Sequence, residues 1–327
     1  MSNISIVGAG KIAYSLVKAL LDAGLNVTSV YSRRKEPSEK LAAKFNIPLY
    51  GDSLSAIDSS SELFFLAVPD SEIENAAYLL ANAKLDFSKC LFVHLSGSQD
   101  ISHLKLLKSK GSSIASFHIM QTFPSCEVVD IKDHFAAIET DNAKTEKYLF
   151  DLAMKLKLKP FHISSENKVF YHLTGVWASN FLIANLFSAF QVFQSAKISE
   201  VDFLQMVKPI ISSTFDNVLK NGISSSLSGP VIRGDLETIK KHVSALSSEV
   251  LSNEALSSEA KNSVSILRSE DVKANDNYQG KFLLLSYLTN TSALLDLVKS
   301  NYGELSDKQK QMGDFLQDMI KKQMSDL

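Results

Sequence analysis

Short apolar runs alternate with longer amphipathic stretches through the first half of the chain. Residues 4–10 (ISIVGAG) are an apolar run that ends in glycines, and residues 11–24 (KIAYSLVKALLDAG) carry apolar side chains at helical spacing. Strands that alternate with helices are typical of a mainly parallel sheet with right-handed crossovers. The first half therefore predicts an α/β domain. Further apolar runs of strand length lie at 26–32, 63–70, 90–98, 113–120 and 134–140.

The second half of the chain has a different pattern, which begins around residues 159–168. From there the chain reads as one helix after another, and residues 166–196 are apolar at nearly every position. A helix that is apolar on nearly every face must be covered on all sides. We therefore predict an all-helical second domain with this helix at its centre, sharing its cover with a partner subunit in a homodimer. The boundary near residue 164 gives domains 1–164 and 165–327.

The composition narrows the classes of partner. Of 327 residues, 45% are hydrophobic and 21% are charged, which is typical of a globular protein. The formal net charge is −2 with no long basic run, which argues against nucleic acid and anionic membrane as partners. Polar residues interrupt the one apolar stretch of membrane length, 169–193, so a core helix explains it better. The start of the chain shows no charged leader, and we expect a cytoplasmic protein.

The sequence predicts no metal site. Cys90 and Cys126 have no metal-ligand spacing and are interpreted as small buried side chains. The histidines outside the motifs described below also show no ligand spacing. They are His94, His103, His134, His162 and His242.

A glycine-rich turn joins the first predicted strand to the first predicted helix. Gly8, Gly10 and Ala13 form the pattern G-x-G-x-x-A, which includes Lys11 and Ile12. The first glycine permits a tight turn, the second lets the backbone approach a pyrophosphate, and the small third residue lets helix and strand pack closely. Phosphates bind at the free N–H groups of such a helix start. The turn therefore predicts a Rossmann-type dinucleotide-binding domain.

The end of the second predicted strand indicates which dinucleotide binds. An NAD site usually carries Asp or Glu there, whereas this chain has Ser32, Arg33 and Arg34. Arginines hold a 2′-phosphate through charge-assisted, often bidentate hydrogen bonds. We therefore predict NADP(H) as the cofactor. The alternative is a basic loop that is merely solvated.

Two later strand ends are expected to face the same ligand crevice. Val68 and Pro69 follow one of these strands and are predicted to form a rigid edge near the nicotinamide. Asp70 is interpreted mainly as the N-cap of the next helix. Ser96 and Ser98 follow another strand and offer hydroxyl groups to a substrate, or else form only a turn.

Four later motifs, in their order along the chain, resemble one bacterial family. Together with the glycine turn they resemble Rossmann-like proteins with a helical C-terminal domain of unknown function. That family is similar in architecture to pyrroline-5-carboxylate, ketopantoate and 3-hydroxyacid reductases. The resemblance implies reduction of a small keto or imino acid, with 2-ketopantoate as its most specific implication. The motifs are VHLSGS (93–98), FHIMQTF (117–123), YHLTGVWASN (171–180) and GPVIRGD (229–235).

The chain departs from these relatives at two positions. Ile119 follows His118 where the family usually has proline, so the turn after His118 is expected to be less rigid. The hydroxyacid and ketopantoate reductases carry a catalytic lysine four residues before an asparagine. Asn180 matches that asparagine, but Val176 stands at the lysine position. The usual proton donor of those enzymes is therefore missing from its place.

Polar residues on the long helix are candidates to replace that donor. Lys168, His172 and Asn180 lie at multiples of four residues and share one face of the helix. His172 is the first candidate to protonate a carbonyl oxygen, Lys168 is the second, and His118 is a competing acid at a strand end. The alternative for His172 is a hydrogen bond to the facing sheet and no chemistry.

The loop 229–235 carries the last candidates. Its glycines and proline make it rigid, and we predict that Arg233 clamps a substrate carboxylate in a bidentate pair. Asp235 is expected either to orient that guanidinium or to cap the following helix. The alternative is that Arg233 and Asp235 pair only with each other to shape the turn.

These features together predict an NADPH-dependent oxidoreductase that reduces the C=O or C=N group of a small carboxylate-bearing substrate. The best single guess is the reduction of 2-ketopantoate to pantoate. The alternative is a non-catalytic NADPH-binding sensor. A sensor would keep the glycine turn and the arginines but would not need His172, Lys168, Asn180 and Arg233 to converge.

Overall fold

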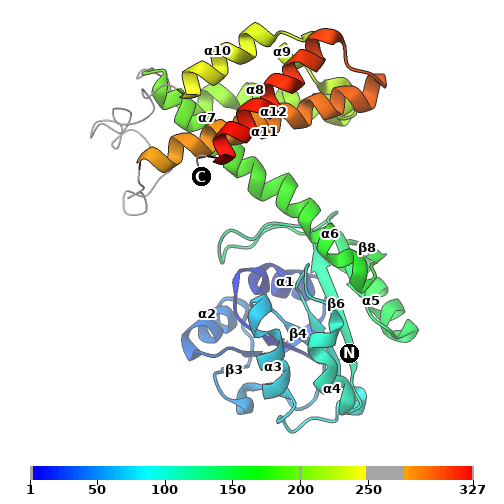
Figure 1. Ribbon diagram of the computed structural model, residues 1–327. Coiled ribbons are helices and arrows are strands. Elements are labelled where there is room, and N and C mark those ends of the chain that lie inside the picture. The colour runs from blue at the N-terminus through cyan, green and yellow to red at the C-terminus, as the bar shows by residue number, and fades with distance from the viewer. Residues whose placement is uncertain (1–2, 199–200, 248–275, 326–327) are drawn as a thin grey trace. The chain divides into compact units, whose positions relative to one another are not determined.

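The computed structural model describes residues 3–198, 201–247 and 276–325 (Figure 1). The chain divides into two compact units, Met1–Leu182 and Ile183–Leu327, which we describe separately. The first unit continues past the predicted boundary at residue 164. It includes the start of the long apolar helix, which the sequence assigned to the second domain.

The first unit is built on one eight-stranded sheet in the order β3-β2-β1-β4-β5-β6-β7-β8. All neighbouring strands are parallel except β6 and β7, which are antiparallel. This confirms the predicted mainly parallel sheet. The strands are β1 (Asn3–Val7), β2 (Asn26–Tyr31), β3 (Leu49–Gly51), β4 (Ser61–Leu66), β5 (Leu91–His94), β6 (Ser113–Ile119), β7 (Phe135–Glu139) and β8 (Lys159–His162).

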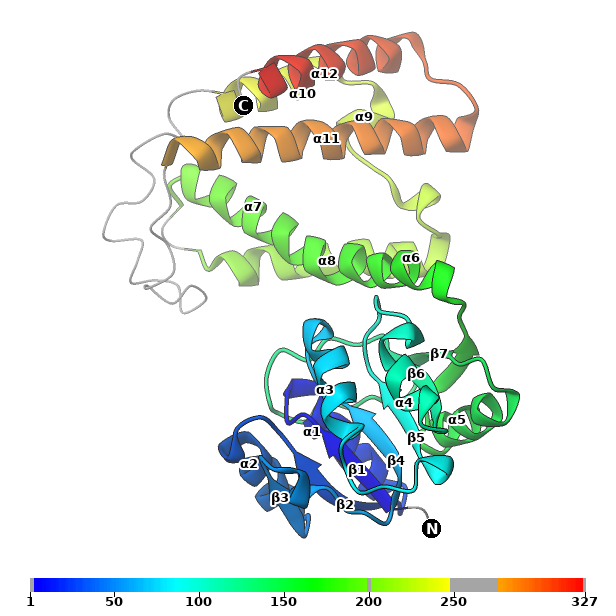
Figure 2. The ribbon, with the colours of Figure 1, turned by 60° about the horizontal axis from the view of Figure 1, so that its bottom comes forward.

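Helices cover both faces of this sheet (Figure 2). Successive strand residues point to opposite faces, so that Phe65 joins one apolar core and its neighbour Phe64 joins the other. The core that contains Phe65 is completed by α1 (Lys11–Asp22), α2 (Lys35–Phe45) and α5 (Ala143–Lys155). The opposite core is completed by α3 (Ile73–Leu80) and α4 (Lys105–Ser109).

The long apolar helix is continuous but is not uniform. It consists of α6 (Ser165–Gly175), a π-helical segment (Val176–Asn180) and α7 (Phe181–Ser195). Among the described residues it is the one helix that is long and apolar enough to cross a membrane. The core helix of a soluble protein can have the same length and composition. Only 6% of its most apolar window is buried in this chain. The described residues therefore do not provide the complete cover that the sequence predicts.

The second unit is helical throughout its described residues. Its core forms where α9 (Pro230–Arg233), α10 (Leu236–Ser247), α11 (Asp276–Tyr302) and α12 (Asp307–Ser325) pack together. Helix α7 contacts α8 (Phe203–Asn221) through the rings of Phe190 and Phe203, whose centroids lie 5.3 Å apart. This agrees with the predicted helical C-terminal region.

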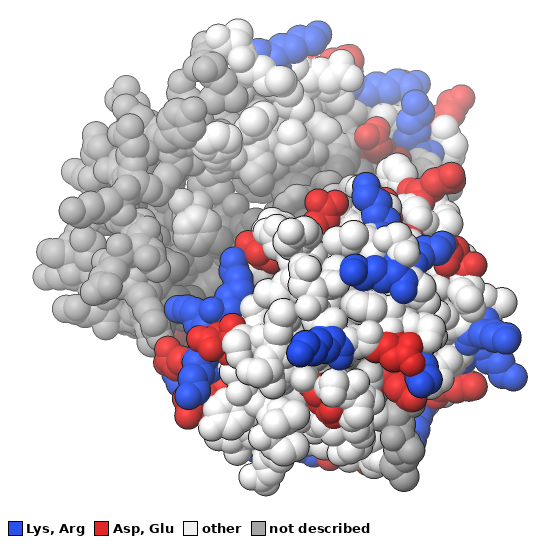
Figure 3. Space-filling model, turned by 90° about the horizontal axis from the view of Figure 1, so that it is seen from below, with Lys and Arg blue, Asp and Glu red and all other residues white. Residues whose placement is uncertain are grey.

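Charged side chains of both signs are interspersed over the face drawn in Figure 3. Lysines and arginines there lie beside aspartates and glutamates, and they do not merge into one broad basic area. Arg33 and Arg34 line a pocket at the carboxyl ends of the strands.

Candidate functional site

The glycine turn follows β1 and begins α1, as the sequence predicts. Gly8 has φ +103°, and a Cβ atom added there would lie 2.3 Å from the carbonyl oxygen of Ala67. No side chain therefore fits at Gly8. Gly10 is the N-cap of α1. Because glycine has no side chain, no cap hydrogen bond competes with an anion for the N–H groups of the first turn. Ala13 is fully buried below the turn.

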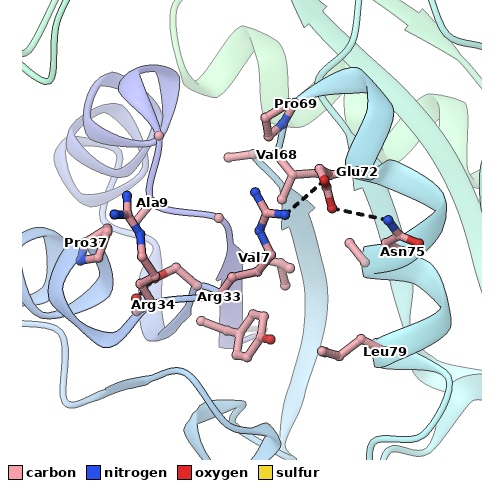
Figure 4. Close-up of a pocket in the computed structure, with 16 residues that line it drawn as sticks. Val7, Ala9, Arg33, Arg34, Pro37, Val68, Pro69, Glu72, Asn75 and Leu79 are labelled. Atoms are coloured by element: carbon pink, nitrogen blue, oxygen red, sulfur yellow. Dashed lines mark hydrogen bonds and ion pairs between the residues drawn. The ribbon is translucent and has the colours of Figure 1, made fainter.

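A pocket of about 360 Å³ opens beside this turn (Figure 4). It lies where β1 and β4 are neighbours and the strand order reverses, which is the usual ligand position in an open α/β sheet. Three of the predicted cofactor residues, Lys11, Ile12 and Ala13, are not part of its lining. The lining residues are Val7, Gly8, Ala9, Gly10, Tyr31, Ser32, Arg33, Arg34, Pro37, Ala67, Val68, Pro69, Glu72, Asn75, Ala76 and Leu79.

The two predicted arginines take different positions in this pocket. Arg33 Nη1 lies 2.9 Å from Glu72 Oε1, so its guanidinium is paired with a carboxylate from the far side (Figure 4). Arg34 is the N-cap of α2 and lies beside Pro37. The buried hydroxyl of Ser32 donates a hydrogen bond to the carbonyl oxygen of Arg34. The second strand therefore ends in a fixed turn that presents both arginines.

The pocket fits NADP(H). A turn with no room for a side chain and an open helix start suit a pyrophosphate. Two guanidinium groups at the end of β2 suit an adenosine that carries a 2′-phosphate.

A hydrogen-bonded cluster continues from the pocket along the same edge of the sheet. Asp70 follows Pro69, and its Oδ2 accepts hydrogen bonds from Ser96 Oγ and Ser98 Oγ, both at 2.8 Å. Asp70 makes no cap hydrogen bond at the short helix that it begins. Its interpretation as an N-cap is therefore wrong, because two serine hydroxyls on the neighbouring loop hold its carboxylate. The loops after β4 and β5 are joined at this point.

Two histidines meet on the glycine between those serines. A Cβ atom added at Gly97 would lie 2.7 Å from both His118 Nε2 and His172 Nδ1. The two imidazole rings pack edge to face, with centroids 5.9 Å apart. Tyr171 completes the cluster, because its hydroxyl lies 3.0 Å from His118 Nδ1. The structure thus brings His118 and His172 together, although they come from different predicted domains.

Burial sets the protonation of two of these groups. It lowers the pKa of His118 to about 4, with smaller contributions from His172 and Lys168. Burial also raises the pKa of Tyr171, which keeps its phenol protonated. His118 is therefore neutral at pH 7 and is a poor source of a proton. His172 lies in the same cluster and is the better placed candidate for the proton donor.

Lys168, the second candidate donor, is held by contacts with the sheet and a neighbouring loop. Its side chain is fully buried, and its Nζ donates to the carbonyl oxygen of Gln99 and, at 2.6 Å, to Ser116 Oγ. Glu139 Oε2 lies 3.1 Å from the same nitrogen. An ammonium group has three protons, and these three partners account for all of them. Lys168 fastens α6 to the sheet through these contacts, and its role as a proton donor stays a prediction.

Asn180, Asp235 and Arg233 are the remaining candidates. Asn180 is exposed in the π-helical segment, and among the described residues no hydrogen bond joins it to the histidines. Asp235 caps α10, because its carboxylate accepts from Thr238 N at 3.1 Å and from Thr238 Oγ1 at 2.7 Å. This agrees with the capping alternative for Asp235. Arg233 is exposed at the end of α9, and its role toward a carboxylate stays a prediction.

The cysteines and the buried histidine have local roles. Cys90 is buried, and burial raises the pKa of its thiol to about 11. Cys126 is exposed, so its interpretation as a buried side chain is wrong. Burial lowers the pKa of His94 to about 3, and its Nδ1 accepts a hydrogen bond from Ser96 N at 3.3 Å. Within the described ranges no group of three or more His, Cys, Asp or Glu side chains could hold a metal ion.

Sequence patterns do not predict three residues of this site. Tyr171 is one of several aromatic residues in the motif YHLTGVWASN and the residues before it, and Glu139 lies at the end of a short apolar run. Glu72 stood in a charged segment that is typical of a solvated helix start. Each acquires its partner from a segment far away along the chain, and spacing cannot reveal such a contact.

Two family models match separate parts of the chain. Residues 3–88 match a family described as NADP oxidoreductase, coenzyme F420-dependent. Residues 134–259 match a family described as a domain of unknown function (DUF2520). No curated protein matches the sequence.

Solved structures match a larger part of the chain than either family model does. A Bacteroides fragilis protein assigned as an NADP oxidoreductase is 26% identical, with a TM-score of 0.65 over 75% of this chain and 91% of its own. A Thermotoga maritima protein is 24% identical, with a TM-score of 0.57 over 74% of this chain and 89% of its own. A reductive aminase from Aspergillus terreus, solved with NADPH and ethyl-5-oxohexanoate, is 13% identical, with a TM-score of 0.55 over 98% and 94%.

These similarities bear on the predicted fold and cofactor. The last two structures support the fold alone, because their identities are low. The family model over residues 3–88 and the Bacteroides fragilis protein are both named for NADP, in agreement with the predicted cofactor. Fold, pocket and similarity together agree with a Rossmann-type domain in the first unit that binds NADP(H).

Proposed function

We propose that the protein is an NADPH-dependent reductase of the C=O or C=N group of a small carboxylate-bearing substrate. One observation carries the proposal: a continuous row of contacts leads from the dinucleotide pocket to groups that can carry protons. Pro69 lines the pocket, Asp70 holds the two serines, and the glycine between those serines contacts both imidazole rings. All of these residues lie at the carboxyl ends of β4, β5 and β6 or on α6.

The proposed reaction needs a proton as well as a hydride. The nicotinamide, when bound, supplies the hydride, and the chain must deliver a proton to the oxygen or nitrogen of the reduced bond. His172 is the proposed donor because it is half-buried beside Gly97. Neutral His118 and the Tyr171 phenol, joined at 3.0 Å, are proposed to orient the cluster.

The substrate class is inferred from less direct support. The Aspergillus terreus reductive aminase, whose fold this chain shares, was solved with a keto ester, ethyl-5-oxohexanoate, beside NADPH. The sequence motifs resemble a family similar to reductases of keto and imino acids. Within that class, 2-ketopantoate stays the first compound to test, followed by other 2-keto acids and cyclic imino acids.

A screen of substrates tests the proposal. NADPH oxidation is followed by its absorbance with a panel of 2-keto acids, keto acids with added amine, and cyclic imino acids. We expect at least one compound to support turnover, and His172→Ala to lower kcat at least tenfold with NADPH affinity unchanged. His103→Ala, which changes a surface histidine beside Glu74, is the control and should retain full activity.

One outcome would contradict the proposed reductase, and another would contradict only the assignment of His172. Tight NADPH binding without turnover of any compound would favour the non-catalytic sensor, in which the histidine cluster has no reaction to serve. Turnover that His172→Ala leaves unchanged would retain the reductase but remove His172 as the donor.

A further inference from the structure

An ion pair spans the dinucleotide pocket from one side to the other. Arg33 comes from the loop after β2, and Glu72 comes from the short helix after β4 (Figure 4). Arg33 Nη1 and Glu72 Oε1 are 2.9 Å apart. The other carboxylate oxygen of Glu72 accepts from Asn75 Nδ2 at 3.3 Å. Glu72 is therefore held at both oxygens, by one residue on each side.

The two partners of this ion pair differ in exposure. The side chain of Glu72 is 24% exposed, whereas that of Arg33 is 71% exposed. A long exposed side chain that is held only by its tip adopts many rotamers when the tip is released. The half-buried carboxylate is thus the fixed end of the pair, and it determines where the Arg33 guanidinium lies.

The pocket around this pair offers a slot for a flat ring. Val68, in the loop after β4, and Ala76 and Leu79, on α3, line it and present apolar side chains. Arg33 lies across from them. A guanidinium is planar and stacks on aromatic faces, and an adenine ring has two apolar faces and a polar edge. An apolar wall opposite a fixed guanidinium therefore suits adenine.

Arg34 is available for a different task. It lies beside Pro37 at the start of α2, away from the Glu72 carboxylate (Figure 4). No ion pair of the described residues involves its guanidinium. As the N-cap of α2 it makes no side-chain cap hydrogen bond. This combination suits the 2′-phosphate.

We propose that Glu72 is a positioning residue of the cofactor site, which holds Arg33 over the adenine slot and leaves Arg34 to recognise the 2′-phosphate. The proposal rests on the proposed binding of NADPH. It divides between the two arginines the task that the sequence assigns to both. Arg33 then serves the adenine that NADPH and NADH share, and Arg34 alone discriminates between these cofactors.

The test measures Kd for NADPH and for NADH by cofactor fluorescence, with no substrate present. Glu72→Gln keeps the shape of the side chain but loses its charge. We expect it to weaken both cofactors by the same factor, about two- to fivefold, which is the range of exposed ion pairs. Arg34→Ala should weaken NADPH about 10- to 150-fold and leave NADH unchanged. Glu74→Gln is the matched control, because Glu74 pairs with His103 outside the pocket lining.

Coupling between the partners provides a second readout. Arg33→Ala should weaken NADPH and NADH alike, and adding Glu72→Gln to it should cause no further loss. A merely structural role of Glu72 would make the two changes additive. The free energy of unfolding of each variant, measured by urea denaturation, should stay at the wild-type value.

Each contrary result has a distinct meaning. Tighter NADPH binding by Glu72→Gln would overturn the proposal and show that Glu72 competes with the phosphate for Arg33. Weakening of NADPH alone by Arg33→Ala would assign Arg33 to the phosphate. No change in Kd with Glu72→Gln would overturn the proposal, because the ion pair would then contribute nothing to cofactor binding. A wild-type chain that binds neither cofactor would overturn the proposed function as well, whereas the other three results leave NADPH binding intact.

Discussion

At the scale of single residues, the buried imidazole of His118 couples the candidate site to pH. The unfolded chain protonates this histidine as pH falls through about 6.5, and the native protein does so only near pH 4. Between these values the unfolded state binds one more proton than the native state. The free energy of unfolding therefore falls as pH falls, by roughly 3 kcal/mol at pH 4.

His118→Gln should flatten this dependence. Glutamine keeps a hydrogen-bonding group near Tyr171 but does not titrate, so the variant should lose roughly 3 kcal/mol less stability than wild type between pH 7 and pH 4. Urea denaturation at several pH values measures the difference. Tyr171→Phe is the comparison, because it leaves the imidazole buried and should keep the wild-type slope. Equal slopes for His118→Gln and wild type would show that burial of His118 does not control acid stability.

Gly97 is the residue whose side chain the site cannot accept. Gly97→Ala places a Cβ atom 2.7 Å from both imidazole rings, so the rings must move. We expect a loss of about 1–3 kcal/mol in the free energy of unfolding and a lower kcat, with NADPH affinity unchanged. Gly313→Ala is the control for the same substitution, because its added Cβ meets Leu295 at an ordinary 3.9 Å. Wild-type turnover by Gly97→Ala would contradict a role for the histidine cluster.

The sequence predicts the residues of the turn better than those of the cluster. Gly8 follows a strand and precedes a helix, so local pattern alone assigns its conformation and its role. Asp70 has the same kind of local pattern, yet two serines from another loop hold its carboxylate and it does not cap a helix. Contacts within a few residues are therefore predictable, and contacts between loops are not.

At the scale of elements, a buried ion pair fastens α6 to the sheet. Lys168 and Glu139 are almost fully buried, and Ser165 Oγ also donates to Glu139 Oε1 at 2.5 Å. The backbone N–H of Ile101 donates to the same oxygen at 3.3 Å. The pair thus joins α6, β7 and the segment after β5. His172 lies one helical turn beyond Lys168, so this attachment sets where His172 meets Gly97.

Breaking this pair from one side should be more harmful than removing both partners. Lys168→Met leaves the Glu139 carboxylate buried without its cation and should lower the free energy of unfolding by about 3–5 kcal/mol. Lys168→Met combined with Glu139→Met removes both charges and should recover part of that loss. Lys144→Met, an exposed position on α5, is the control. A double variant less stable than Lys168→Met would show that the hydrogen bonds of Glu139, and not its charge, hold the helix.

Hydrophobic periodicity accounts for most elements of the sheet but misses its edge strands. The strands β1, β2, β4, β5, β6 and β7 coincide with the predicted apolar runs. The edge strand β8 begins with Lys159 and Pro160 and is largely unburied, so its sequence has little apolar signal. The long helix was predicted correctly, whereas the packing of its first turns on the sheet depends on the buried ion pair, which periodicity does not detect.

At the scale of the whole molecule, the described residues of the second unit leave large apolar side chains on α7 and α8 exposed. Ile183 and Phe187 on α7 are exposed, as are Ile210, Phe215 and Leu219 on α8. Monomeric soluble proteins rarely expose so many large apolar side chains together. We propose that a second copy of the chain covers these helices in a homodimer. Lipid is the less suitable cover, because Asn185 and Gln191 lie on α7 and polar side chains are unfavourable in a bilayer.

The mass of the protein in solution tests this proposal. Size-exclusion chromatography with light scattering, at micromolar concentration and without detergent, should give twice the chain mass of 36.0 kDa. Combining Ile210→Glu with Leu219→Glu places charges on α8 and should produce a monomer with unchanged NADPH affinity, because the dinucleotide pocket lies wholly in the first unit. Tyr78→Glu, an equally exposed change on α3, should leave the dimer intact. A stable wild-type monomer would show that a second copy of the chain does not cover these helices. A protein that stays soluble only with lipid vesicles would instead assign the apolar helices to a membrane surface.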